Sequence, residues 1–182
     1  MLNGSAIRTY IEVDALLQVE ISASLLALAE APGAASAPRL ARMLARTLEP
    51  SWLAHVSLQE HVVVPILAAY RGDRLGGLMC CSDTGHASLS QQHAEIGRHL
   101  ARAGANASMS MAELDGLLRA IYARRLDHLA HAGRLIEHLP GEFSAADCAL
   151  WRMWLSLRRG TQFPLDLIWR RAPSARVAEP LH

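Results

Sequence analysis

The chain has 182 residues and a formal net charge of +1, with 51% hydrophobic and only 5% aromatic residues. This length suits one domain with its own core, and the balanced charge excludes recognition of nucleic acid by a broad positive field. No apolar run reaches the ~18 residues that a membrane span needs, and the N-terminus lacks the pattern of a secretory signal. Three cysteines are a poor disulfide framework, so we expect a cytoplasmic protein that binds neither nucleic acid nor membrane.

Helical periodicity dominates the chain, because Ala and Leu supply most of its apolar residues. Breaks at proline, glycine and polar loops divide it into expected helices over residues 5–31, 41–48, 50–70, 88–104, 110–139 and 144–159. Residues 71–86 are predicted to form a loop. Helix starts are indicated by Pro50, which suits a first turn, and by three pairs that resemble capping boxes, Ser88 with Gln91, Ser110 with Glu113 and Ser144 with Asp147.

Four long amphipathic helices with modest connections predict an all-α fold, an up-down four-helix bundle with an additional C-terminal helix. We expect a single domain over residues 1–172 and a loose tail over 173–182. Cys80 and Cys81 fall in the predicted loop without the spaced pair of a zinc site, and we interpret them as thiols without a special role. Cys148 is expected to pack on the last helix.

The apolar stripe of each long helix carries a polar residue near its middle. These residues are Glu20, His55 with Gln59 one turn on, His93 and His128. In an antiparallel bundle they would meet at one depth, where they must satisfy each other, bind water or hold a cation. Imidazole and carboxylate suit zinc, iron or copper, and a hydrogen-bonded core without a metal is the alternative. The other histidines are read as surface residues, namely His61, His86, His99, His131 and His138.

Several stretches, taken in order, resemble the hemerythrin-like, or HHE cation-binding, family. HVSLQEHVVVPIL (55–67) is similar to the second-helix motif, a His followed by a Glu pair one turn later and then by Pro. QQHAEIGRHL (91–100) and LDHLAHAGRLIEHLP (126–140) look like the third and fourth helices. ALLQVEISASLLALAEA (15–31) is similar to the first, with Glu20 in place of its His. The resemblance covers roughly residues 10–140 and implies a bundle that holds non-haem iron and binds or senses oxygen, nitric oxide or iron.

Three departures from the family pattern affect the metal site that the resemblance implies. Glu20 replaces the first His, Gln59 replaces a bridging Glu, and Ala132 follows His128 where a second bridging carboxylate is expected. Two iron ions need anionic bridges to offset their repulsion, and only Glu60 could partly substitute. The expected metal ligands are therefore Glu20, His55, Glu60, His93 and His128, with His131 as the alternative to His128. They would hold one ion or an atypical di-iron centre.

Two functions remain open from the sequence. The first is a hemerythrin-like metal-binding protein that takes a small gas ligand. The second is a metal-free bundle that serves as a regulatory or interaction module, with a protein partner or a second copy on the C-terminal helix. Trp151, Trp154 and Trp169 would either pack on the core or form that surface. An enzyme is not favoured, because nothing places a general base beside an open metal position.

Overall fold

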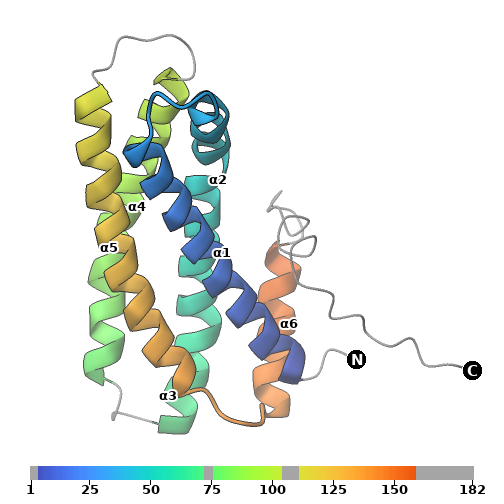
Figure 1. Ribbon diagram of the computed structural model, residues 1–182. Coiled ribbons are helices and arrows are strands. Elements are labelled where there is room, and N and C mark those ends of the chain that lie inside the picture. The colour runs from blue at the N-terminus through green and yellow to red at the C-terminus, as the bar shows by residue number, and fades with distance from the viewer. Residues whose placement is uncertain (1–3, 72–75, 104–110, 159–182) are drawn as a thin grey trace, which may run out of the picture.

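Every regular element in the part of the chain that the structure describes is helical, as the sequence predicts. The computed structural model describes the backbone of residues 4–71, 76–103 and 111–158, and the side chains of 4–70, 86–102 and 114–157. The elements are α1 (Gly4–Glu30), α2 (Ala37–Leu58), the π-helical η1 (Gln59–Val63), α3 (Val64–Arg71), α4 (Gly76–Ala103), α5 (Met111–Glu137) and α6 (Ala145–Arg158) (Figure 1). No helix within these ranges is long and apolar enough to cross a lipid bilayer.

The long helices α1, α2, α4 and α5 lie side by side (Figure 1). α1 packs against α2 and α5, and α4 packs against the same two helices. Neighbours run in opposite directions: Asp14 of α1 contacts His55 of α2, and four residues later Gln18 contacts Ser51. α6 packs on η1 and on the first half of α1.

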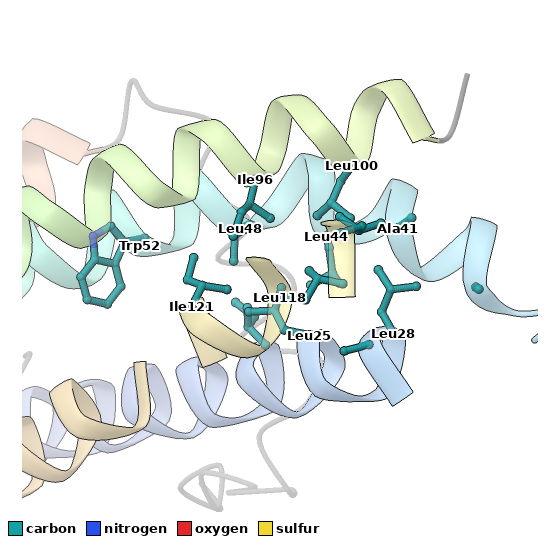
Figure 2. Close-up of a cluster of buried hydrophobic side chains, with 14 of the residues drawn as sticks. Leu25, Leu28, Ala41, Leu44, Leu48, Trp52, Ile96, Leu100, Leu118 and Ile121 are labelled. Carbon is teal, nitrogen blue, oxygen red and sulfur yellow. The ribbon is translucent and has the colours of Figure 1, made fainter. Parts of the chain in front are cut away.

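Two apolar clusters fill the space between the helices. The first gathers large aliphatic side chains around Leu25, Leu44 and Leu118, and Trp52 lies at one end of it (Figure 2). The second lies at the other end of the helices and gathers Ile7, Val62, Leu67, Leu135 and the two tryptophans of α6. Each fully buried leucine or isoleucine contributes about 1.5–3 kcal/mol relative to an exposed one. The two clusters therefore hold the helices at both ends and leave a polar layer between them.

Trp151 and Trp154 belong to the second cluster, and only 2% and 4% of their surface is exposed. Both rings pack edge-on against Tyr10 of α1. Core packing is thus the correct one of the two alternatives for these residues, while Trp169 lies outside the described residues. Cys148 packs against the same cluster, as expected.

α2 does not begin at Pro50, which corrects the expected boundary. One helix runs through residues 37–58 with Pro50 inside it, and the proline at its start is Pro38. A proline inside a helix removes one backbone hydrogen bond, and here the packing of Leu44, Leu48 and Trp52 on one face offsets that loss. α2 continues directly into η1, where the Val64 N–H donates to the Gln59 carbonyl five residues back.

α4 begins at Gly76, so the predicted loop over residues 71–86 is wrong for its greater part. Ser88 consequently lies inside the helix and caps nothing; its hydroxyl accepts a hydrogen bond from Arg124. Cys80 and Cys81 are helical as well, with side chains outside the described set. Glycine, serine and aspartate favour turns only weakly against tertiary packing, which is why they misplace this boundary.

The cap of α6 is confirmed. The Ser144 N–H and hydroxyl both donate to Asp147 Oδ2 at 2.7 Å, and the Asp147 N–H donates back to Ser144 Oγ. The Tyr70 hydroxyl, near the end of α3, donates to the same oxygen at 2.9 Å and so connects α6 to α3. Of the remaining predictions, the Ser110 cap and the tail over 173–182 lie outside the described residues.

Candidate functional site: a buried layer of histidines

Four imidazoles surround the indole of Trp52 in the middle of the molecule. His93 stacks on it with ring centroids 4.6 Å apart, and His128 meets it edge-on at 4.9 Å. His55 and His86 lie at 5.4 Å and 6.0 Å. The rings come from α2, α4 and α5, and all four histidines are buried. The predicted meeting of polar groups at one depth is thus found, although its membership differs from the expected one.

His55 links a carboxylate to a second imidazole. A carboxylate only accepts hydrogen bonds, so the His55 Nδ1–H donates to Asp14 Oδ2, 2.5 Å away. The His55 Nε2 lies 3.1 Å from the Nε2 of His128. One of these two nitrogens carries the hydrogen that joins the rings, and the other accepts it. This arrangement is a chain of carboxylate, imidazole and imidazole that crosses from α1 through α2 to α5.

Arg125 organises the other side of the layer. Its guanidinium donates to Ser22 Oγ at 2.9 Å, to the Gln18 side-chain oxygen at 2.8 Å and to the Gln18 carbonyl at 3.1 Å. It also donates to His93 Nε2. Because the His93 Nδ1 contacts the Leu89 carbonyl, which only accepts, His93 donates from Nδ1 and offers its Nε2 lone pair to the guanidinium. Arg125 on α5 is thereby bonded to both α1 and α4.

The protonation states follow from burial. Desolvation, followed by the positive charge of Arg125, lowers the pKa of His93 to about 3. Desolvation, followed by the neighbouring His55, lowers the pKa of His128 to about 2. Both rings are therefore neutral at pH 7. Burial also lowers the pKa of Arg125 to about 10 against the opposing effect of Asp14, so the guanidinium stays charged.

His86 occupies the edge of the layer beside the π-helical segment. Its Nδ1 lies 2.9 Å from Glu60 Oε1, and its Nε2 lies 2.8 Å from Gln59 Oε1. Its ring centroid is 4.9 Å from that of His128. Since an ordinary helix turns about 100° per residue, Gln59 and Glu60 would normally diverge, yet here both reach one imidazole. π-helical turns often occur at functional sites, and this one places two adjacent side chains on His86.

The expected ligand set is brought together only in part. His55, His93 and His128 lie in the layer, which places His128 and not His131 there. Glu20 is exposed, which corrects its assignment to the inner stripe of the first helix. Glu60 lies at the surface edge, bound to His86. His86 itself is buried, so its interpretation as a surface residue is wrong, while His61 is exposed as expected.

Sequence reasoning missed three members of the layer. Asp14 was missed because the buried face of α1 is rotated from the expected one and carries Asp14, Gln18 and Ser22 between Ile11 and Leu25. The four-residue spacing of those polar residues among isoleucines was the available signal. His86 is missed because the sequence predicts a loop for its segment. Arg125 lies one turn before His128 on the same face of α5, and this spacing of a charged residue was the available signal.

The donor set does not fit the bridged pair of iron ions that the family resemblance implies. Gln59 is neutral, Ala132 is buried without a donor atom, and the His93 lone pair already accepts from a guanidinium. Among the described side chains, no group of three His, Cys, Asp or Glu residues is placed to hold one ion. The two facing nitrogens of His55 and His128 are the donors that remain.

The fold and the site together define an all-helical protein with a buried layer of imidazoles, one carboxylate and one guanidinium. Comparison of the chain with protein-family models, with curated proteins and with solved structures gives no match in any of the three.

Proposed function

We propose that this chain is a hemerythrin-like up-down four-helix bundle that binds one transition-metal ion through His55 and His128. The antiparallel packing of α1, α2, α4 and α5, with α6 added on one side, supports the bundle. The order of the motifs around His55, His93 and His128 along the chain supports the family. The ligand set is narrower than the one expected from sequence, because Glu20 is exposed and His93 is bound to Arg125.

The observation that carries this proposal is the pair of facing Nε2 atoms, 3.1 Å apart. With metal–nitrogen bonds of about 2.0–2.1 Å, two imidazole nitrogens on one ion stand roughly 3.0–3.4 Å apart, depending on the angle between the bonds. Asp14 accepts from the other nitrogen of His55, which is the usual support of a metal-bound histidine. A cation could thus replace the proton that His55 and His128 now share.

Imidazole ligands suit iron, zinc, copper and nickel. Non-haem iron is the metal that the family resemblance implies, and its function there is to bind or sense oxygen, nitric oxide or iron. Ferrous iron held by these two imidazoles would supply reversible binding of small gaseous ligands. We therefore propose sensing or binding of such a ligand as the function, with Asp14 holding His55 in the tautomer that presents Nε2.

Metal analysis of protein purified without oxygen and without chelator tests the proposal, followed by titration of the apo protein with Co²⁺ in visible absorption. We expect one equivalent of metal. His55→Gln and His128→Gln should each weaken binding by more than the roughly 10–100-fold that loss of a supporting carboxylate causes. His61→Gln is the matched control, since His61 is exposed and its Nδ1 is bonded to Ser57, one helical turn earlier. A wild-type protein that takes up no metal after reconstitution overturns the proposal.

A second function is favoured by the charge balance of the layer. Within the layer, the charges of one carboxylate, Asp14, and one guanidinium, Arg125, sum to zero, and a divalent ion would add uncompensated charge there. On this reading the chain is a metal-free hemerythrin-like bundle that serves as a regulatory or interaction module. Dialysis against EDTA should then leave the Tm unchanged, whereas loss of a bound ion would lower it by about 5 °C or more.

A further inference from the structure

An apolar strip lies on the outer side of the seam between α1 and α5, which pack side by side (Figure 1). Leu16 and Val19 of α1 are 63% and 49% exposed, and Leu126 of α5 is 40% exposed. Val19 directly follows Gln18, and Leu126 directly follows Arg125, which is bonded to Gln18 across the seam. Because the two helices are antiparallel, the residue after each of these partners turns toward the same outer face. The three exposed side chains therefore form one apolar surface.

The strip continues along α5 and covers part of the buried layer. Tyr122 and Leu129, about one turn before and after Leu126, are half-buried and extend it along the seam. Large apolar side chains that gather on one surface mark an interaction site. The strip lies directly outside the hydrogen bonds between Arg125 and Gln18. A partner on this surface would therefore also shield those bonds from water.

Charged residues of opposite sign flank the strip at one end. Glu12 of α1 lies one turn before Leu16, and Arg134 lies near the end of α5; both are exposed. These ends of the two helices are neighbours, because Arg8, one turn before Glu12, donates to the Leu139 carbonyl. Within the described part of the chain, neither Glu12 nor Arg134 forms an ion pair. The rim of the strip thus offers one unpaired acid and one unpaired base.

We propose that a second copy of this chain covers the strip, related to the first by a two-fold axis that runs parallel to α1 and α5. The α1 of one copy then lies over the α5 of the other, antiparallel to it. Leu16 and Val19 meet Leu126 of the second copy, and Glu12 meets Arg134 of the second copy. Symmetry repeats every contact, so the dimer has two such ion pairs. The complementary charges favour a second copy as the occupant.

Sedimentation velocity over a range of protein concentrations tests the proposal. We expect the wild type to pass from monomer to dimer between about 1 μM and 1 mM, as for a small interface. Leu16→Glu puts a charge into the apolar centre and should weaken the dimer more than about tenfold. Leu126→Glu repeats the test on α5. Leu157→Glu is the matched control, because Leu157 is 75% exposed on α6 and not on the seam, and it should leave the dimer unchanged.

Charge reversal tests the arrangement of the two copies. Glu12→Arg and Arg134→Glu should each weaken the dimer by about tenfold or more, because each sets like charges against each other twice. The double variant restores opposite charges and should dimerise like the wild type. An equimolar mixture of the two single variants should form a heterodimer, since both of its ion pairs then join opposite charges. An effect within one chain does not produce that heterodimer.

The same variants show which outcomes overturn the inference. Since the changed side chains are exposed, the Tm of each variant at low concentration should stay within about 2 °C of the wild type. A wild type that stays monomeric up to about 1 mM overturns the inference, including the case in which residues 159–182 of the same chain cover the strip. A dimer that Leu157→Glu abolishes, or that ignores the charge variants, overturns it as well. None of these results depends on a metal ion, so the proposed function stands or fails separately.

Discussion

The buried layer has two halves that satisfy their polar groups in different ways. In one half, Asp14, His55 and His128 form a chain of acceptor and donor atoms in which a single shared proton joins the two rings. In the other half, Arg125 supplies a permanent charge to His93 and Gln18. Trp52 stands between the halves and contacts the rings of both.

The hydrogen bond between His55 and His128 is replaceable, whereas the guanidinium of Arg125 is fixed. A proton between two imidazoles can leave and be replaced by another cation, whereas a guanidinium is covalently part of α5 and keeps its charge at any ordinary pH. The cation between His55 and His128 can therefore be exchanged, while the hydrogen bonds of Arg125 keep α1, α4 and α5 together.

Removal of the permanent positive charge of Arg125 should destabilise the protein more than any other single change in the layer. Arg125→Met keeps much of the side-chain volume but leaves Asp14 without its counter-charge and His93 without a donor. We expect the free energy of unfolding to fall by about 3–5 kcal/mol, as when one partner of a buried pair is removed. Urea denaturation at pH 7 measures this loss. Arg119→Met, on the exposed face of the same helix, should change it by less than about 1 kcal/mol.

Low pH should weaken the second half through His93. Because its folded pKa of about 3 lies below the value of 6.5 in the unfolded chain, its contribution is complete above pH 6.5 and is lost as the pH falls toward 3. Each pH unit below 6.5 costs about 1.4 kcal/mol for this residue. The stability difference between the wild type and His93→Gln should therefore shrink by about 3 kcal/mol between pH 6.5 and 4.5. Parallel stability curves for the two proteins would contradict this.

The sequence predicts the faces of α2 and α5 well, and the reason is physical. The expected inner residues His55 of α2 and His128 of α5 are both buried, because the apolar residues at helical spacing on either side of them leave one choice of inner face. α1 is apolar nearly all round, with Leu16 and Val19 exposed, so hydrophobicity alone does not fix its rotation. That ambiguity placed Glu20 inside and left Asp14 out.

The candidate site was harder to predict than the fold, because it depends on partners from distant segments. His86 lies in the layer because its helix starts at Gly76, twelve residues before the predicted start at Ser88, and because η1 brings Gln59 and Glu60 together on it. Neither effect is local to the histidine. Arg125 similarly becomes a structural cation only once Gln18 and Ser22 face it from α1.

The first half is weakened more mildly by removal of its carboxylate. Asp14→Asn keeps an acceptor oxygen near His55 Nδ1. It removes the negative charge that holds the His55 ring in place and that balances the positive charge of Arg125. We expect a loss of about 1–3 kcal/mol in the free energy of unfolding, the range for a buried hydrogen bond to a charged group. Thermal and urea unfolding at pH 7 measure it. A variant as stable as the wild type would show that Asp14 does not hold this half together.

The smallest effect is expected at the edge of the layer, where Glu60 meets His86. The Glu60 side chain is 39% exposed, so water screens its interaction, and the amide of Glu60→Gln still offers an oxygen to the His86 Nδ1. We expect a change below about 1 kcal/mol in urea denaturation at pH 7. Glu95→Gln is the matched control and should behave alike, because Glu95 lies 3.9 Å from His99 on the surface of α4. A loss of several kcal/mol for Glu60→Gln alone would show that the pair of Glu60 and His86 also holds the layer together. The division of the layer into one replaceable and one permanent half would then be wrong.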